Sequence, residues 1–427
     1  MPMTWLHPRD ELVATMQRIY RYRMTTTSGG NLSIRDENGD IWITPSRVDK
    51  GTLQPRDIVC IHADGTIDGL HPPSSEFPFH REIYRQRPDL RAIVHAHPGA
   101  LVAFSICRQL PDTRIQSHAH SICGRIAMAP YACPGTDALA DRIADTFADG
   151  ADCVLLENHG VVIGGTDLAD AFQRFETFEF TAQTIIKARQ LGELQVLPPE
   201  SLDADTTATW ADLPETKPSL TEKELRAQIT AFTQRAYQQR LLISTAGAVS
   251  ARIDAENFVI TPRRRDRLEV SPANLVRASR TACEAGRQPS RAALLHALIY
   301  ERFAEVGAVI NAQPAHASAF CMTAEKLGTH TIPESYVVLN DVPRLSFQRI
   351  VEDADAIVAA LDPVKTPVVL IENEGAVVLG RTVLEAFDRL EVLEATSEAL
   401  LLARPLGPIV EMPESAIDEL RAAFNVP

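Results

Sequence analysis

The chain alternates between short apolar runs and longer stretches in which apolar residues recur with helical spacing. The first helical stretch is predicted to begin at an Asp10 cap and to end near Tyr22, with an apolar stripe of Leu12, Val13, Met16 and Ile19. Similar spacing predicts helices over residues 74–87, 99–107, 136–150 and 167–192. Short strands separated by turn residues are predicted over residues 31–36, 40–46, 57–67, 91–98 and 153–164. Because hairpin-like pairs dominate, we expect an antiparallel or mixed sheet flanked by helices.

This pattern occurs twice along the chain. Four blocks, at residues 27–47, 72–84, 94–99 and 154–176, each resemble a block that lies about 215 to 217 residues further on. Such steady spacing indicates a tandem duplication. Residues 193–219, rich in Pro, Asp, Thr and Ser, are predicted to link a domain of residues 1–192 to one of residues 220–427. Each domain is long enough to bury its own core.

Two histidines of the first half have the spacing of metal ligands. His95 and His97 stand at positions i and i+2 of a predicted strand, so their imidazoles are expected on one face. His159, before a turn glycine, is a third candidate ligand, and Glu76 at a helix start is a fourth. Three imidazoles with an open position are typical of a catalytic metal site. Taken singly, these residues have simpler explanations: a chance histidine pair, a core histidine, and a carboxylate that complements a helix dipole.

The second half of the chain distinguishes between these explanations. The counterparts of His95, His97, His159 and Glu76 are Asn311, Gln313, Glu374 and Ala292. Packing residues are retained, as in the pairs Tyr84/Tyr300, Pro98/Pro314, Gly160/Gly375 and Phe172/Phe387. A structural role would not predict changes at all four candidate positions on a retained scaffold. The sequence therefore favours a metal site in the first half that the second half has lost.

The motifs GNLS, TPS, PSSE, HAHP and ENHG, in this order and spacing, resemble those of the class II aldolase/adducin family, which includes fuculose- and rhamnulose-phosphate aldolases and ribulose-phosphate 4-epimerase. The resemblance covers residues 8–192 with all motifs and residues 220–405 in degenerate form. It implies two tandem α/β domains, each with three α/β/α layers and a central, mostly antiparallel sheet. It also implies Zn2+, or another divalent metal such as Mn2+, Co2+ or Fe2+, on His95, His97 and His159, with Glu76 as the acid/base.

The same resemblance implies an anion-binding set of loops. In the phosphate-using members the matching residues cradle the phosphate, and in this chain they are Gly30, Asn31, Thr44, Ser74 and Ser75. The family's common glycine after TPS is replaced here by Arg47. Arginine prevents a close backbone approach to an oxyanion but binds carboxylate or phosphate through two hydrogen bonds. Arg47 therefore favours an anionic substrate, with a solvent-facing side chain as the alternative.

Three further features stay open at this level. Family aldolases place a tyrosine of a neighbouring subunit in the active site, and Tyr336 stands in the comparable region of the second half, where a half-buried strand residue is the alternative. His118 and His120 form a second HxH pair, for which a solvated loop is the alternative. The arginines at 263–265 are either anion-binding residues or a solvated basic turn.

The expected function is a divalent-metal-dependent lyase of the aldolase type. A metal on neutral ligands polarises a substrate carbonyl, and a nearby carboxylate moves the proton as a metal-bound enediolate forms or collapses. The reaction would make or break a C–C bond next to a carbonyl in a small anionic hydroxylated substrate. Decarboxylation or epimerisation of a carboxylated or phosphorylated substrate is the enzymatic alternative, with non-haem iron oxygenation more distant. A non-catalytic, adducin-like interaction module is the alternative outside enzymes.

Composition narrows the expected partners and location. The 427 residues carry a formal charge of −14, which argues against nucleic acid or an anionic membrane as the main partner. No apolar run approaches the roughly 20 residues of a membrane span, no signal peptide is evident, and the seven cysteines are scattered, so a cytoplasmic protein is expected. Since family members form four-fold tetramers, a homo-oligomer is expected in which two chains make a pseudo-tetramer.

Overall fold

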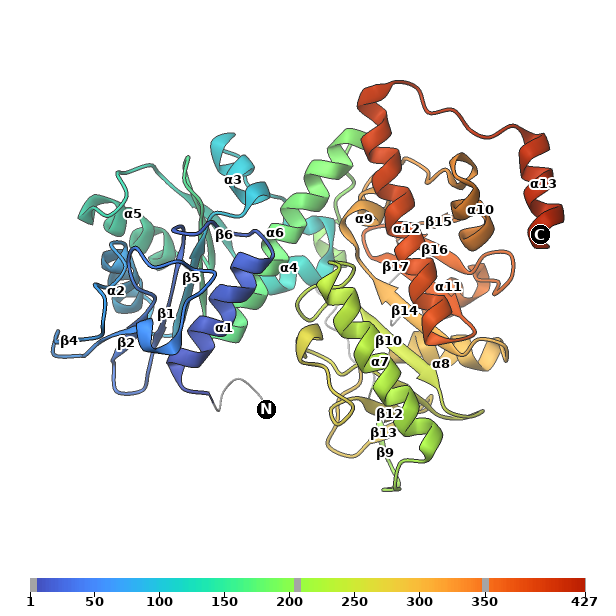
Figure 1. Ribbon diagram of the computed structural model, residues 1–427, viewed down its shortest axis with the longest axis horizontal. Coiled ribbons are helices and arrows are strands. Elements are labelled where there is room, and N and C mark those ends of the chain that lie inside the picture. Colours follow the sequence, from blue (N-terminus) through green and yellow to red (C-terminus); the bar gives the residue numbers. More distant parts are fainter. Residues whose placement is uncertain (1–5, 203–208, 348–352, 427) are drawn as a thin grey trace. The chain divides into compact units, whose positions relative to one another are not determined.

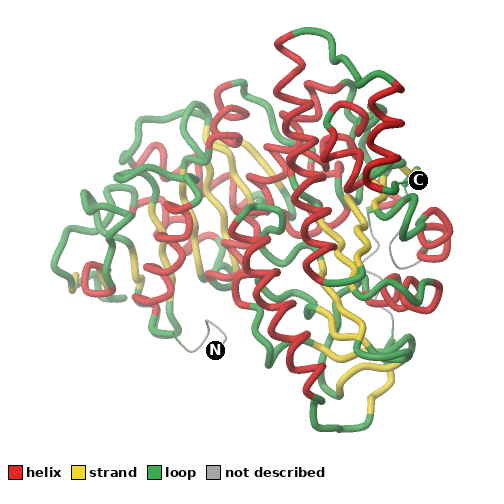
Figure 2. Tube along the Cα trace, turned by 45° about the vertical axis from the view of Figure 1, so that its right-hand side comes forward, coloured by secondary structure: helices red, strands yellow, loops and turns green. Residues whose placement is uncertain are grey.

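The computed structural model describes residues 6–202, 209–347 and 353–426, which fold into two compact units (Figure 1). Unit 1 comprises Met1–Thr113 and His118–Gln183, and unit 2 comprises Arg114–Ser117 and Thr184–Pro427. In each unit the strands form one layer with helices packed along it (Figure 2). This arrangement confirms the α/β class and the duplication predicted from the sequence.

Unit 1 is built on an eight-stranded sheet with the order β4-β3-β2-β1-β5-β8-β7-β6. The strands are β1 (Asn31–Arg35), β2 (Ile41–Ile43), β3 (Val59–Ile61), β4 (Ile67–Asp68), β5 (Ala92–Ala96), β6 (Ile126–Ala129), β7 (Cys153–Leu156) and β8 (Val161–Gly165). Neighbouring strands are antiparallel apart from the parallel pair β6 and β7. The sheet is therefore mostly antiparallel, as expected.

The helices of the first half cover both faces of this sheet. They are α1 (Pro8–Arg21), α2 (Phe77–Gln86), α3 (Gly99–Ile106), α4 (Ser117–Cys123), α5 (Asp137–Ala148) and α6 (Leu168–Leu191), with short 3-10 helices at Pro55–Asp57 and Thr113–Ile115. Helices α2 and α5 pack together over one face, and α1 lies on the other, against β1 and β2 (Figure 1). Two sequence expectations were wrong here. His7 rather than Asp10 caps α1, because Pro8 takes the first helical position, and the segment holding His118 and His120 is helix α4 rather than a loop.

Unit 2 repeats this sheet and adds one strand. Its order is β15-β16-β17-β14-β10-β11-β12-β13-β9, which matches unit 1 strand for strand except for β9. The strands are β9 (Ala211–Leu213), β10 (Ala248–Arg252), β11 (Phe258–Ile260), β12 (Val276–Ala278), β13 (Ala282–Glu284), β14 (Ala308–Ala312), β15 (Arg344–Leu345), β16 (Val368–Ile371) and β17 (Gly375–Gly380). Strand β9 lies within the predicted linker and pairs in parallel with β13. Part of the segment predicted as a linker therefore forms an edge strand of unit 2.

The helices of unit 2 follow the same plan. They are α7 (Leu220–Gln238), α8 (Ala293–Arg302), α9 (Ala315–Cys321), α10 (Pro333–Leu339), α11 (Ala354–Ala360), α12 (Val383–Ala403) and α13 (Glu414–Phe424), with 3-10 turns at Pro199–Ser201, Arg267–Glu269, Thr329–Thr331 and Arg404–Leu406. Helices α8 and α11 pack together over one core, in the manner of α2 and α5.

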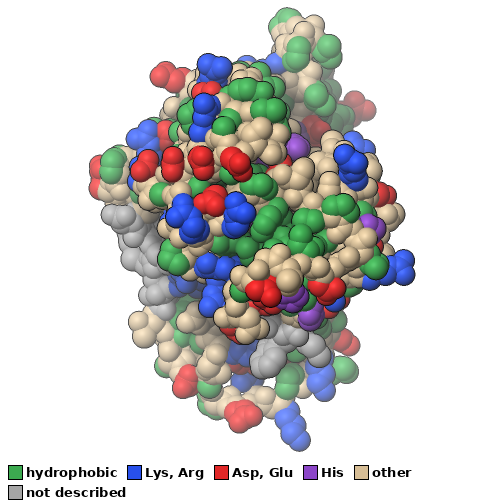
Figure 3. All heavy atoms as spheres, turned by 90° about the vertical axis from the view of Figure 1, so that its left-hand side faces the viewer, with side chains coloured by type: hydrophobic (Ala, Val, Ile, Leu, Met, Phe, Trp, Pro, Cys, Tyr) green, Lys and Arg blue, Asp and Glu red, His purple; other side chains and the backbone are tan. Residues whose placement is uncertain are grey.

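On the face shown in Figure 3, acidic and basic side chains are interspersed rather than gathered by sign. Among the described residues, no helix has both the length and the apolar character needed to cross a membrane.

Candidate metal centre

The end of β5 and the turn between β7 and β8 bring three histidines of unit 1 together. His95 lies in β5 opposite Val162, His97 stands one residue beyond that strand, and His159 lies in the turn. The Nε2 atoms of His95 and His97 are 3.2 Å apart, and the three ring centroids are 4.8–5.1 Å apart. Each residue offers a nitrogen within 4.8 Å of the others, which is close enough for one metal ion.

The environment of the histidines favours neutral imidazoles. Nδ1 of His95 donates to the carbonyl oxygen of Val161 at 3.0 Å, which leaves the lone pair of Nε2 directed at the cluster. Burial, and then the interaction with the neighbouring His95 imidazole, lowers the pKa of His97 to about 3. The same causes lower the pKa of His159 to about 4. Neutral imidazole is the form that binds metal, so these side chains are ready to act as ligands at neutral pH.

Glu76 at the N-cap of α2 reaches into this cluster. Its Oε2 lies 3.1 Å from Nε2 of His95 and accepts a 2.7 Å hydrogen bond from Nδ2 of Asn31, and its Oε1 lies 3.6 Å from Nε2 of His159. Burial raises the pKa of Glu76, but its electrostatic interactions with His95 and His159 and its hydrogen bonds outweigh this, so the pKa lies well below its ordinary value. Glu76 is therefore a carboxylate held beside the histidines.

Two glycines allow the backbone to approach the histidines. A Cβ on Gly160 would lie 2.5 Å from Cδ2 of His97, so no other residue fits there without moving the ring. Gly30 has a φ of 71°, and a Cβ on it would lie 2.7 Å from the carbonyl oxygen of His95. The glycines of the GNLS and ENHG motifs therefore serve the packing of the histidines.

The predicted anion-binding loops lie at the same end of the strands as the histidines. A bridge between Pro45 and Pro73 joins the loop after β2 to the loop before α2. Thr44 is fully buried and its Oγ1 accepts a 3.1 Å hydrogen bond from the backbone N–H of Leu32. Ser74 is buried and its Oγ accepts from the backbone N–H of Glu76, whereas Ser75 is exposed. Both buried hydroxyls keep a proton that can be donated to an anion.

Arg47 adopts a backbone conformation that glycine takes more readily than other residues do. Its φ is 59°, in the left-handed region, and its side chain is exposed. The counterpart in unit 2, Arg264, has a φ of 50°. The turn has therefore kept a glycine-like backbone in both units, at a cost of about 1–2 kcal/mol for a residue with a Cβ.

Two buried residues of this region were missed by the sequence reasoning. His80 donates from Nε2 to Oδ1 of Asn31 at 2.5 Å, and its Nδ1 lies 2.7 Å from Oγ of Ser33. Lys50 donates to the carbonyl oxygen of Pro45 at 2.8 Å, and burial lowers its pKa to about 8. The internal repeat could have indicated both residues. Their counterparts in the second half, His296 and Arg267, keep the imidazole and the positive charge.

The corresponding place in unit 2 has a different chemistry. Oδ1 of Asn311 lies 2.6 Å from Nε2 of His296, and Ala292 stands at the N-cap of α8. Glu374 occupies the position of His159, and burial raises its pKa to about 7 against the opposing charge of Arg291. Among the described residues of unit 2, no group of three metal-ligating side chains comes together.

The other candidates from the sequence lie outside the cluster. Tyr336 is buried in helix α10 of unit 2, not in a strand, and its hydroxyl accepts a 2.9 Å hydrogen bond from Nε of Arg421 in α13. Nδ1 of His120 lies 3.0 Å from Oγ1 of Thr113. Tyr336 belongs to unit 2, whereas the three histidines belong to unit 1.

A second group of possible ligands lies elsewhere in unit 1. It consists of Asp40, Cys60 and His62, with Nδ1 of His62 at 2.9 Å from Oδ2 of Asp40. Burial and nearby carboxylates raise the pKa of the Cys60 thiol to about 11. Because a metal binds the thiolate, this group fits a metal less well than the three histidines do.

Comparison with known proteins finds the same family in both halves of the chain. Residues 10–186 and 227–401 each match the family described as "Class II Aldolase and Adducin N-terminal domain". A 5-deoxy-D-ribulose 1-phosphate aldolase of Bacillus thuringiensis serovar kurstaki is 35% identical over 199 residues, which cover 46% of this chain and 92% of that protein. A 3-oxo-tetronate 4-phosphate decarboxylase of Haemophilus influenzae is 31% identical, over 45% of this chain and 96% of that protein. A solved L-fuculose 1-phosphate aldolase is 32% identical with a TM-score of 0.43, over 46% of this chain and 92% of that one.

Proposed function

Because the chain belongs to the class II aldolase and adducin family, we propose that it is a metal-dependent lyase that makes or breaks a C–C bond beside a carbonyl. The substrate class is a small hydroxylated molecule that carries a phosphate or carboxylate. The observation that carries this proposal is the set of three histidines around the ionised Glu76.

The donor set fits a divalent transition metal. Three imidazole nitrogens lie within 4.8 Å of one another, so one ion could bind all three, and three protein ligands are typical of catalytic sites. His95, His97 and His159 would hold Zn2+, and the same donors suit Mn2+, Co2+ or Fe2+. When bound there, such a metal polarises the substrate carbonyl and the neighbouring hydroxyl.

Glu76 is placed to move the proton of the reaction. In an aldol cleavage the hydroxyl on the β carbon loses its proton, the bond between the α and β carbons breaks, and the electron pair left on the α carbon takes up a proton. Glu76 delivers the proton that the α carbon takes up, having first taken it from water, and in bond formation its carboxylate removes the same proton from that carbon. Asn31 fixes the carboxylate through its Nδ2, and its own Oδ1 is held by His80. The loop residues Gly30, Thr44, Ser74 and Ser75 would receive the anionic group.

A second group must accept the proton of the β hydroxyl, and we propose Tyr336 for this role. Its hydroxyl would act in the site of a neighbouring subunit, so the proposal includes a homo-oligomer, with two chains forming a pseudo-tetramer. Arg421 of α13 donates a hydrogen bond to the Tyr336 hydroxyl at 2.9 Å and so holds it in place.

Decarboxylation is the second candidate, and Arg47 supports it. Loss of CO2 from a 3-oxo acid leaves an electron pair on the carbon beside the carbonyl, as aldol cleavage does. The same polarising site and the same Glu76 would serve both reactions. The exposed Arg47 offers a guanidinium for a second anionic group, and the relative from Haemophilus influenzae is named for such a reaction.

A substrate screen tests the proposal. Metal-replete protein is incubated with 5-deoxyribulose 1-phosphate, fuculose 1-phosphate and 3-oxo-tetronate 4-phosphate. Aldol cleavage of the first two releases dihydroxyacetone phosphate, and decarboxylation of the third releases CO2. Glu76→Gln should lose at least about a hundredfold in turnover while it keeps its metal. Glu374→Gln, at the degenerate position in unit 2, is the matched control and should stay active; full turnover of Glu76→Gln would refute the role of Glu76.

A further inference from the structure

The group of Asp40, Cys60 and His62 lies on two strands at one edge of the unit 1 sheet. Asp40 comes directly before β2, Cys60 lies in β3, and His62 directly follows β3. Cys60 stands opposite Trp42, and side chains two residues apart on a strand share a face, so the three side chains lie on one side of the sheet. Strand β1 separates β2 and β3 from β5, which holds His95. The group is therefore distinct from the three histidines.

The three ligand atoms are close enough to hold one ion. A carboxylate oxygen of Asp40, Sγ of Cys60 and a ring nitrogen of His62 all lie within 4.8 Å of one another. Nδ1 of His62 is 2.9 Å from Oδ2 of Asp40 and 3.9 Å from Sγ of Cys60. Around a tetrahedral zinc ion with ordinary bond lengths, such pairs of atoms stand about 3.3–3.6 Å apart. Both measured separations differ from these values by only a few tenths of an ångström.

Neighbouring groups hold the ligands in place. The backbone N–H of Ala63 donates to Oδ1 of Asp40 at 2.9 Å, which leaves Oδ2 directed at His62. Asp36 accepts a 3.1 Å hydrogen bond from the backbone N–H of Asp40 and so fixes the turn before β2. Cys60 is fully buried, whereas the side chains of His62 and Asp40 are 41% and 20% exposed. The thiol thus approaches an ion from the interior, while water reaches it from outside.

The local charge favours a divalent cation. The hydrogen bond and charge of Asp40, and the charges of Asp64 and Asp68, raise the pKa of the His62 imidazole, so positive charge is stabilised here. Asp68 stands opposite Cys60 on β4, and Arg9 offsets its charge at a distance of 3.5 Å. A thiolate and a carboxylate together carry a charge of −2, so a divalent ion on this group forms a site without net charge.

Unit 2 keeps the strands of this edge but has lost all three ligands. Strands β11 and β12 pair in the same register as β2 and β3. The three ligand positions of unit 1 correspond there to Asn257, Arg277 and Ser279. A guanidinium in place of the thiol repels a cation. The joint loss of three ligands on a retained scaffold repeats what happened at the three histidines, and three unrelated surface residues would not predict it.

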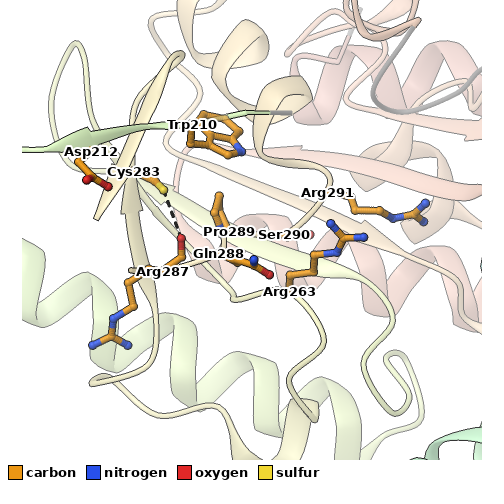
Figure 4. A pocket seen from close by; sticks show the side chains of 9 residues that line it. All are labelled: Trp210, Asp212, Arg263, Cys283, Arg287, Gln288, Pro289, Ser290 and Arg291. Carbon is orange, nitrogen blue, oxygen red and sulfur yellow. Dashed lines mark hydrogen bonds between the residues drawn. The ribbon is translucent and has the colours of Figure 1, made fainter. Parts of the chain in front are cut away.

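A cysteine of unit 2 provides a comparison for Cys60. Cys283 is buried in the edge strand β13, and its thiol donates to the carbonyl oxygen of Arg287 at 3.4 Å, drawn as a dashed line in Figure 4. Asp212 stands opposite Cys283 on β9, but no histidine is among the described residues that line the pocket there. Cys283 therefore has a neighbouring carboxylate without the imidazole that Cys60 has.

We propose that Asp40, Cys60 and His62 form a second metal site in unit 1, here called the edge site, which takes Zn2+ or a softer divalent ion such as Cd2+ with water as the remaining ligand. Cys60 must release its thiol proton to the solvent before it binds, so the three histidines fill first and the edge site fills only with excess metal. A purified chain that holds one ion keeps it on the histidines. The edge site joins β2 to β3 and is independent of the reaction proposed for Glu76.

Cobalt(II) distinguishes the two sites because only the edge site contains sulfur. The parent protein for the test is the full-length chain with the exposed Cys107 and Cys133 replaced by serine. The first equivalent of Co2+ should give only the weak visible bands of an ion bound by nitrogen and oxygen. The second equivalent should add the near-ultraviolet charge-transfer band of a sulfur–cobalt bond. A parent protein that shows no such band at millimolar Co2+ overturns the proposal.

Variants of the parent protein assign the band to its ligands. Cys60→Ser should lose the sulfur band and keep the bands of the first equivalent, whereas the matched control Cys283→Ser should keep both. A sulfur band that persists in Cys60→Ser overturns the proposal, because another thiol then binds the ion. His62→Gln and Asp40→Asn change partly exposed side chains and so spare the core. Each should bind the second equivalent at least about tenfold more weakly, and unchanged binding in both overturns the edge site.

Discussion

Nε2 of His296 lies 2.6 Å from Oδ1 of Asn311, so the residue that replaces the candidate ligand His95 serves as the acceptor for a buried histidine. In unit 1 the equivalent His80 donates instead to Asn31, which lies on the neighbouring strand. A buried N–H needs an acceptor, and the position of Asn31 is Ala248 in unit 2. In unit 2 the former ligand position in β14 therefore supplies the hydrogen-bond acceptor that in unit 1 lies on β1, the strand next to β5.

We predict that Asn311→Ala destabilises unit 2 without affecting catalysis in unit 1. The change leaves Nε2–H of His296 buried without its acceptor, which should lower the free energy of unfolding by about 1–3 kcal/mol. Urea unfolding and the lyase assay measure the two effects separately.

Asn31→Ala is the matched variant in unit 1. It should cost a similar free energy of unfolding because His80 loses its acceptor, but it should also lower turnover because Glu76 loses its 2.7 Å hydrogen bond. Equal turnover in the two variants would show that Asn31 does not position Glu76.

The fold could be predicted from the sequence because the two halves of the chain can be compared with each other. The repeat and the family motifs predicted two mostly antiparallel sheets, and the strand orders of both units confirm them. The match of both halves to one family confirms the resemblance. The spacing of His95 and His97 also predicted their proximity, although His97 lies just beyond the strand end.

The hydrogen-bond partners could not be predicted in the same way. Nothing in the spacing shows that His80 reaches Asn31, because that contact joins a helix to a strand across 49 residues of sequence. Strand β9 was missed because it has only 3 residues, Ala211–Leu213, which are largely exposed and form a strand only because β13 offers an edge. Tertiary context, not local pattern, determines both features.

Arg47→Gly should stabilise the protein and weaken substrate binding. A glycine accepts a φ of 59° without strain, so the free energy of unfolding should rise by about 1 kcal/mol. Loss of the guanidinium should raise the KM for an anionic substrate by about tenfold. Steady-state kinetics and thermal unfolding measure these changes.

Arg264→Gly tests whether the two effects of Arg47→Gly have separate causes. Its backbone conformation is similar, with a φ of 50°, but it belongs to unit 2. It should relieve the backbone strain and leave KM unchanged. A rise in KM in this variant would mean that the turn acts through the backbone rather than through the charge of Arg47.

Metal analysis should find one divalent ion per chain rather than two. Unit 1 brings three imidazoles together, whereas Asn311 in unit 2 is engaged by His296 and Glu374 is buried. Addition of metal at about a hundred times its dissociation constant should stabilise unit 1 by about 2.7 kcal/mol, seen as a rise of roughly 5–10 °C in one unfolding transition. His97→Ala should abolish both the ion and the shift. Two ions per chain would contradict the loss of the second site.

The buried histidine of unit 2 should make stability depend on pH. Burial lowers the pKa of His296 to about 4, whereas an unfolded chain has a histidine pKa of about 6.5. Below about pH 6.5 the unfolded state therefore binds a proton that the folded state excludes, so stability is greatest above that pH and falls as the pH drops toward 4. Between pH 7.5 and 5 this single group should cost about 2 kcal/mol.

His296→Gln removes this titration and keeps a polar side chain. Its free energy of unfolding should be lower than that of the wild type at pH 7.5, because the bonds to Ser250 and Asn311 change, but it should fall less between pH 7.5 and 5. His7→Gln, at the exposed start of α1, is the control, because it removes an exposed imidazole instead of a buried one. An equal fall in all three proteins would show that the acid sensitivity arises elsewhere, because only His296→Gln removes a fully buried imidazole.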